Sequence, residues 1–139
     1  MRIIMFVIVV SAFLFNSGCA TSGSINSDAQ FHPDNKTIFL SRHFTGYEER
    51  HLGEVVRTFE KYGFDFTHER DEANYYLDYS IDAGAMARVT IALLENGQQV
   101  LEVKASNAGW GTVIARPAAI SSRVTAATKR LDRLLSQSH

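Results

Sequence analysis

Strict alternation of apolar and polar side chains runs through the middle of the chain, and it limits the fold to one built around an antiparallel sheet. This period of two is typical of strands with one face on a core and the other in water. It occupies residues 75–82, 87–93 and 101–105. The expected inward rows are Tyr75, Leu77, Tyr79 and Ile81, then Ala87, Val89, Ile91 and Leu93, then Leu101, Val103 and Ala105.

Asn96-Gly97 lies between the second and third rows and predicts a hairpin. A two-residue loop would place Ile91 opposite Glu102 and bring a charge onto the core face. A three-residue loop that includes Glu95 would instead set Ile91 opposite Leu101. Because a slip of one residue turns a strand's side chains to the other face, burial favours the longer loop. We therefore predict a type I turn with Gly97 in the left-handed position of a bulge.

A strand, a helix and a second strand are predicted before the alternating region. Residues 37–41 contain three consecutive apolar side chains, which indicates a strand buried on both faces. The run from Thr45 to Glu48 has capping-box spacing, and Gly63 is placed to end the helix. Residues 64–66 would form the second strand, parallel to the first across a right-handed crossover. The expected buried face of the helix is Leu52, Val55, Val56 and Phe59.

A last helix is predicted from Pro117, because its missing N–H costs nothing at the first helical position. Apolar side chains then recur every three or four residues, at Ile120, Val124, Ala127, Leu131 and Leu134 or Leu135. The cations Arg123, Lys129, Arg130 and Arg133 occupy other positions. These elements predict one two-layer α+β domain over residues 36–139. Its sheet would be mixed, mostly antiparallel and of about five strands, with two helices on one face.

The order of these elements, over residues 36–135, resembles that of small periplasmic domains of envelope proteins. The amino-terminal domain of the Tol-system translocation protein and the curli secretion lipoprotein are two such domains. The resemblance rests on element order alone, so it implies a fold and carries over no functional residue.

The amino-terminal segment has the features of a targeting signal. Arg2 precedes an almost unbroken apolar run from Ile3 to Phe15, and small residues follow before Cys19, the single cysteine. A positive start, a short apolar core and small residues before a cut describe a secretory signal. Ser17-Gly18-Cys19 resembles the end of the bacterial lipoprotein lipobox, although Asn16 stands where that family usually has Leu. The resemblance implies that residues 1–18 are removed and that Cys19 is acylated and becomes the amino terminus.

Two other interpretations of this segment stay open. It could be an uncleaved membrane helix, although a span needs about 20 apolar residues and this run stops at Asn16. It could also be an ordinary signal peptide with Cys19 as a bystander. A lone thiol, however, has no partner within its own chain in an oxidising compartment.

The residues after the cysteine predict how the domain is held. Residues 19–35 are rich in Ser, Asn, Asp and Gly and have no hydrophobic period, which predicts a flexible tether. Ala20 follows the cysteine, whereas lipoproteins of the inner membrane often have Asp there. The resemblance therefore implies a lipid anchor in the outer membrane, with the domain on the periplasmic face.

Charge and motif content narrow the classes of function. Residues 1–18 contain one basic and no acidic side chain, so the remainder has a formal charge of −2 and no basic cluster that suits nucleic acid. The five histidines lack the spacing of a zinc helix, and the sequence has no nucleophile elbow, phosphate loop or dinucleotide fingerprint. We therefore expect no catalytic, cofactor or metal site. The solvated outer face of the sheet is expected to carry Asp78, Asp82, Arg88, Glu102 and Lys104.

Two aromatic residues are the candidate partner-binding residues. Trp110 lies between two glycines ahead of the last helix, and tryptophan is a frequent binding anchor, but we expect it to cap the core. Tyr76 points outward from its predicted strand. The expected function is that of a non-enzymatic envelope lipoprotein that contacts the membrane through its lipid and binds an envelope protein or polymer. The alternative is a small periplasmic hydrolase or glycan-active enzyme.

Overall fold

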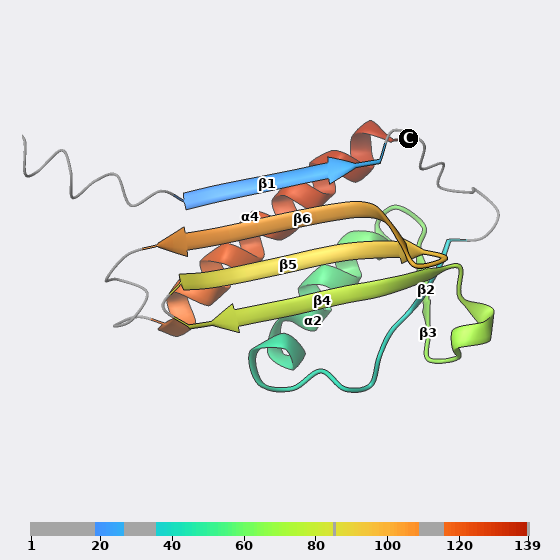
Figure 1. Cartoon of the computed structure of the whole chain (residues 1–139), viewed down its shortest axis with the longest axis horizontal. Helices are drawn as coiled ribbons and strands as arrows, with labels where there is room; N and C mark the ends of the chain where they lie inside the picture. Colours follow the sequence, from blue (N-terminus) through green and yellow to red (C-terminus); the bar gives the residue numbers. More distant parts are fainter. Residues whose placement is uncertain (1–18, 27–35, 85, 109–115, 139) are drawn as a thin grey trace, which may run out of the picture.

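One six-stranded sheet with two helices on one of its faces makes up the structure (Figure 1). The computed structural model describes residues 19–26, 36–84, 86–108 and 116–138. The strands are β1 (Cys19–Ile25), β2 (Thr37–Phe39), β3 (Asp65–Thr67), β4 (Tyr75–Ala83), β5 (Met86–Glu95) and β6 (Gln98–Ala108). The helices are α2 (Gly46–Glu60), the 3-10 turn η1 (Arg70–Glu72) and α4 (Arg116–Gln137).

The strands lie in the order β1-β6-β5-β4-β2-β3. β2 runs parallel to both β3 and β4, and the other pairs are antiparallel. Figure 1 shows α2 and α4 together behind the sheet, and no described helix lies in front of it. The predicted two-layer α+β fold is confirmed, as is the parallel pairing of the strands on either side of α2. The sheet has six strands because it also includes β1.

The alternating region supplies most of the sheet's share of the core. Every predicted inward side chain except the half-buried Ile81 is at most 4% exposed. α2 contributes Val55 and Phe59, while its Leu52 and Val56 are only half-buried. α4 adds the predicted stripe of Ile120, Val124, Ala127, Leu131, Leu134 and Leu135.

Arg123 does not lie on an open side of α4. Only 8% of it is exposed, because it is three residues from Ile120 and four from Ala127 and so flanks the inward stripe. Its Nη2 donates a hydrogen bond of 2.8 Å to Ser122 Oγ, and its Nε has no acceptor among the described residues. Long cationic side chains can be covered in this way when their aliphatic stems lie along apolar surface.

The hairpin between β5 and β6 differs from the predicted register. Glu95 pairs with Gln98, so the loop is Asn96-Gly97 alone, with φ of 51° and 79°. Positive φ at both positions is what a type I′ turn requires. A register shift follows beyond Leu94, and it sets Ile91 opposite Val103. The predicted three-residue loop is therefore wrong, because a bulge within β6 keeps both rows inward instead.

The predicted capping box is also wrong, although the helix begins where expected. Thr45 is the residue before α2, but its hydroxyl makes no capping hydrogen bond. Glu48 turns away from the helix end, and its Oε1 accepts the backbone N–H of Ile81 at 3.2 Å. This bond ties α2 to β4. Gly63, with φ of 78°, follows the end of the helix as predicted.

β1 corrects the prediction of a flexible tether for Cys19–Ile25. All seven residues pair with β6, and the Asn26 N–H continues the ladder to the Val100 carbonyl at 2.9 Å. Gly23 lets α4 approach, since a Cβ there would lie 2.9 Å from Leu134 Cδ1 and 3.0 Å from Arg130 Cγ. The small side chains of β1, which predicted a linker, are therefore also compatible with a strand that pairs through its backbone. Within the described residues, no helix is long and apolar enough to cross a membrane.

Candidate functional site

Cys19, the predicted lipidation site, belongs to β1 and is not part of a separate linker. It lies opposite Asn107 of β6, which in turn lies opposite Ala87 of β5. The residue that the lipobox resemblance marks is therefore in register with two inner strands. The signal-like residues 1–18 and the candidate binding residue Trp110 lie outside the described residues, so their predictions stay untested.

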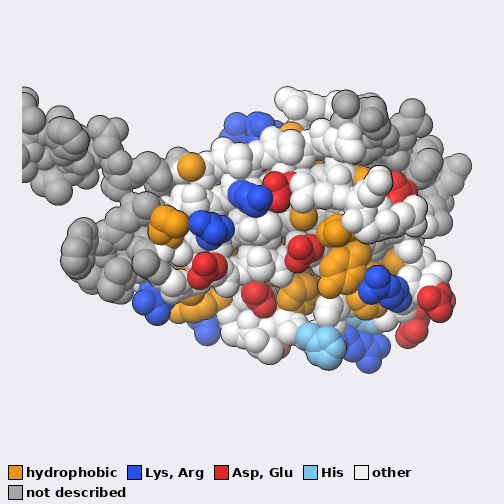
Figure 2. Space-filling view, in the orientation of Figure 1, with side chains coloured by type: hydrophobic (Ala, Val, Ile, Leu, Met, Phe, Trp, Pro, Cys, Tyr) orange, Lys and Arg blue, Asp and Glu red, His pale blue; other side chains and the backbone are white. Residues whose placement is uncertain are grey.

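The open face of the sheet carries the charged residues that the alternation placed there. Asp78, Asp82, Arg88 and Lys104 are exposed, and Glu102 is half-buried. Lys104 Nζ lies 2.6 Å from Glu102 Oε1, while Arg88 is the direct cross-strand neighbour of Asp82. Figure 2 shows acidic and basic side chains interspersed over this face. Mixed, solvated pairs of this kind contribute little to stability and form no strong field.

Tyr76, the other candidate, belongs to an aromatic cluster at one end of this face. Its ring stacks on that of Phe39 with centroids 5.8 Å apart and planes at 21°. The guanidinium of Arg70 lies over both rings, 5.5 Å from the centroid of Tyr76 and 6.0 Å from that of Phe39. Three elements, β2, η1 and β4, each supply one member, and we call this set the Phe39–Arg70–Tyr76 cluster.

A hollow of about 220 Å³ adjoins the Phe39–Arg70–Tyr76 cluster. Leu94 adds an apolar surface, and the Asn96-Gly97 turn forms one side. The complete lining is Phe39, Arg70, Ala73, Asn74, Tyr75, Tyr76, Leu94, Asn96 and Gly97. Two ring faces, a guanidinium and amide groups can hold a ligand by stacking and hydrogen bonding.

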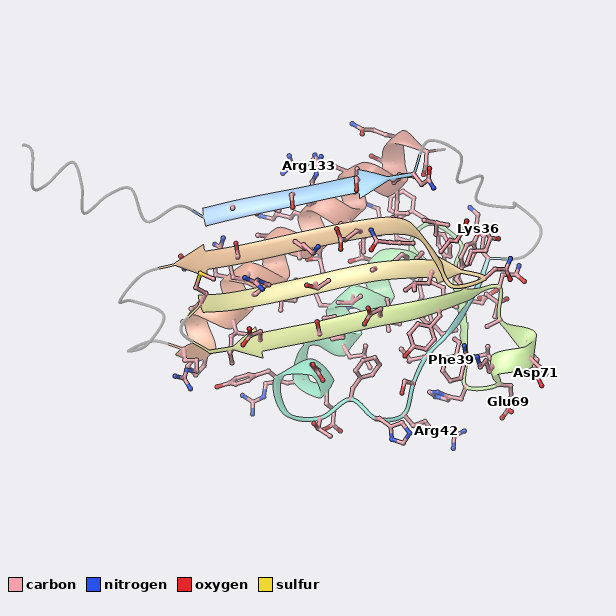
Figure 3. All side chains as sticks on the ribbon, viewed as in Figure 1. Lys36, Phe39, Arg42, Glu69, Asp71 and Arg133 are labelled. Atoms are coloured by element: carbon pink, nitrogen blue, oxygen red, sulfur yellow. The ribbon has the colours of Figure 1, made fainter. Side chains whose placement is uncertain are left out.

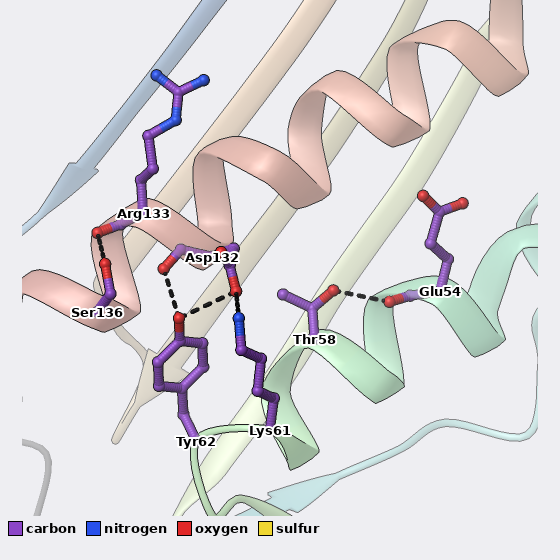
Figure 4. Close-up of polar contacts among 7 residues, drawn as sticks. All are labelled: Glu54, Thr58, Lys61, Tyr62, Asp132, Arg133 and Ser136. Atoms are coloured by element: carbon purple, nitrogen blue, oxygen red, sulfur yellow. Dashed lines mark hydrogen bonds and ion pairs between the residues drawn. The ribbon is translucent and has the colours of Figure 1, made fainter.

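A second polar group joins the two helices on the other side of the molecule (Figure 4). Lys61 Nζ lies 2.6 Å from Asp132 Oδ1, and the Tyr62 hydroxyl donates to the same oxygen at 2.9 Å. The bond from Lys61, and then that from Tyr62, lowers the pKa of Asp132, and the bond to Asp132 raises the pKa of Lys61. Glu54 accepts the hydroxyls of Thr125 and Thr128 from α4. These contacts pin α2 to α4 and have a structural role.

Sequence reasoning found Tyr76 but missed Phe39 and Arg70. Tyr76 was visible as an aromatic side chain in a polar outward row. Arg70 precedes Asp71 and Glu72, a run of charges that is typical of a solvated turn, and no local signal links it to rings on β2 and β4. Phe39 lies beside Tyr76 because β2 pairs with β4, and no sequence signal predicts that pairing.

Comparison with known proteins supports the fold. No protein-family model matches the chain, and no curated protein matches its sequence. Among solved structures, it is similar to a PelC dodecamer from Paraburkholderia phytofirmans that carries a leucine-to-methionine substitution, in space group C2, at 14% identity and a TM-score of 0.50. That match covers 85% of this chain and 99% of the PelC chain. A second PelC dodecamer from the same organism, in space group P6, matches at 14% identity and a TM-score of 0.41 over 80% and 99% of the two chains.

Proposed function

We propose that this chain is a small envelope lipoprotein, anchored by acyl groups on Cys19 and acting as a non-enzymatic component of an assembly at the periplasmic face of the outer membrane. The apolar segment and Ser17-Gly18-Cys19 support the anchor. The observation that carries the proposal is the backbone pairing of Cys19 with Asn107 of β6. The residue that would hold the lipid is thereby part of the folded sheet.

Direct attachment would hold the domain against the membrane surface. Neighbouring strands lie about 4.8 Å apart, so Asn107 and Ala87 follow Cys19 within roughly 10 Å across the sheet. Met86, which is next to Ala87, is 41% exposed. Several acyl chains make such anchoring stable, whereas one chain alone is marginal.

Assembly from several copies is supported by the likeness to a PelC structure that is a dodecamer. It is also supported by the two edges of the sheet. Within the described residues, no strand pairs with the outer side of β1 or of β3. Open strand edges offer backbone N–H and C=O groups to another chain.

Binding rather than catalysis is supported by the chemistry of the hollow. Its described lining contains ring faces, amides and one guanidinium, and it contains no carboxylate, histidine, serine or cysteine. Those absent groups are the usual nucleophiles and general bases of hydrolases. A surface of this composition suits a component that holds a partner.

The anchor is tested by intact mass measurement of the purified membrane protein and by membrane fractionation. We expect the loss of residues 1–18, a gain of acyl mass and recovery with the outer membrane. Cys19→Ala should release or mislocalise the protein, whereas Ser22→Ala, a similar small change in β1, should leave it in place. An uncleaved, unacylated chain would refute the anchor, and a monomer by light scattering in detergent would refute the assembly.

A further inference from the structure

We propose that the hollow beside the Phe39–Arg70–Tyr76 cluster binds a monocarboxylate attached to a flat apolar group. This site goes beyond the proposed membrane anchoring and does not depend on it. Its parts are a positioned guanidinium, two aromatic rings and the side chain of Leu94, all on the lining of one hollow.

The guanidinium of Arg70 is positioned by the two rings, while its hydrogen-bond donors have no acceptor in the described part of the chain. It lies over the rings of Phe39 and Tyr76, 6.0 Å and 5.5 Å from their centroids, and it carries five N–H donors. Among the described residues, no acceptor or carboxylate is within hydrogen-bond or ion-pair reach of its side chain. A fixed fork of donors matches the two oxygens of a carboxylate.

The acidic residues beside Arg70 in the sequence do not neutralise it. Figure 3 shows Glu69 and Asp71 on the outer side of η1, away from Phe39. Glu72 Oε2 is 3.5 Å from the hydroxyl of Thr67 and makes no ion pair with Arg70. These three carboxylates make the field around η1 negative, so they weaken the binding of any anion, and they weaken that of a phosphate dianion more than that of a monocarboxylate.

The size and surface of the hollow define the rest of the ligand. At roughly 30 Å³ per water molecule, 220 Å³ is enough for about seven waters, or for one six-membered ring with its carboxylate. This is below the roughly 300–1,000 Å³ of pockets for drug-sized ligands. Leu94 and the exposed parts of the two rings give an apolar surface on which a flat group can pack.

The test uses the purified full-length protein in detergent and three small probes. We expect benzoate to bind with a dissociation constant of about 1 mM, as suits a ligand of this size. Benzamide, which keeps the ring without the charge, and acetate, which keeps the charge without the ring, should each bind at least tenfold more weakly. Ligand-observed saturation-transfer NMR and calorimetry measure these constants.

Substitutions separate a ligand site from a structural role for Arg70. Arg70→Gln should weaken benzoate at least tenfold, and Arg70→Lys should weaken it severalfold because a lysine lacks the fork. Arg88→Gln removes the same charge from the same open face at the end near Cys19, and it should leave benzoate binding unchanged. Thermal unfolding of each variant shows whether the fold is kept. If Arg70→Gln unfolds, the comparison of benzoate with benzamide on the wild-type protein still tests the role of the charge. Tyr76→Phe keeps the ring and should retain binding.

Two further probes identify where the carboxylate comes from. If Ala-Ala-Phe with a free carboxyl terminus binds more tightly than benzoate, and its amide does not, the site takes the end of a polypeptide. If benzoate binds more tightly, the site takes a free small acid, and both results support the carboxylate site. No binding of benzoate to the folded protein, equal binding of benzamide, or unchanged binding by a folded Arg70→Gln variant would overturn it.

Discussion

The two edges of the sheet are held in different ways. Near the β2–β3 edge, aromatic rings pack edge to face. The centroid of Phe59 lies 5.4 Å from that of Phe64 and 6.3 Å from that of Phe66. The centroids of Phe64 and Tyr75 are 6.1 Å apart. The β1 edge has small side chains, and a backbone ladder with β6 holds it. Arg130 Nη2 adds one hydrogen bond of 3.1 Å to the Gly23 carbonyl. Both edges are paired through the backbone, but buried aromatic side chains support the β2–β3 edge and mostly small side chains line the β1 edge.

The largest effect is expected at the aromatic edge. Phe59→Ala should lower the free energy of unfolding by about 3–5 kcal/mol, because it leaves a cavity among buried rings. Urea denaturation measures this loss. Leu52→Ala, on the same helix but half-buried, should cost clearly less. A loss for Phe59→Ala below about 1 kcal/mol would show that the ring cluster does not hold this edge.

A smaller and more local effect is expected at the β1 edge. Gly23→Val should cost about 1–3 kcal/mol, because the new side chain meets Leu134 and Arg130 in a packed place. Hydrogen exchange should become faster in β1 while β4 and β5 stay protected. Ser22→Val, whose side chain is exposed on the same strand, is the matched control and should leave exchange nearly unchanged. Slow exchange of β1 in Gly23→Val would contradict the fit of the glycine.

The smallest effect is expected for the ion pair that links α2 to α4. Asp132→Asn should destabilise the fold slightly at neutral pH, because exposed pairs contribute little. The pKa of Asp132 is lowered, so its contribution is present above the ordinary pKa of 3.8 and is lost as the pH falls through the folded value. The pKa of Lys61 is raised, so its contribution is present below 10.5 and is lost as the pH rises through the folded value.

Denaturation midpoints across the pH range check this prediction. The difference in denaturation midpoint between wild type and Asp132→Asn should shrink at both the acidic and the alkaline end of the pH range. Tyr62→Phe removes the hydroxyl bond to Asp132 and should keep most of the loss at high pH, because the bond to Asp132 is the largest cause of the raised pKa of Lys61. A difference that does not change with pH would mean that the pair does not act through its charges.

The contrast between the edges also explains how much of the fold could be predicted from the sequence. Val89, Ile91 and Leu93 are buried and alternate with polar or small residues. Such alternation is visible in the sequence, so it predicts a strand with one buried face. β1 has no such period, because its partner is a backbone ladder and its key residue, Gly23, acts by having no side chain. The same small residues suit a tether equally well.

The hairpin and the hollow were beyond prediction for a related reason. Burial correctly required Ile91 and Leu101 to face the same side, but a longer loop and an internal bulge both meet that requirement. The Phe39–Arg70–Tyr76 cluster joins a turn to two strands across 37 residues of chain. The pairing of β2 with β4 sets Phe39 beside Tyr76, and Arg70 reaches both rings from η1.

The pairing of Cys19 with β6 has a mechanical consequence. In the proposed anchoring, tension on the lipid would act on the end of an edge strand. The hydrogen bonds between β1 and β6 would then break one after another from that end. The seven residues of β1 would then release about 23 Å of slack at roughly 3.3 Å per residue. The aromatic core near the β2–β3 edge would bear little of this force. β1 could therefore detach under a brief pull and pair with β6 again while the rest of the domain stays folded.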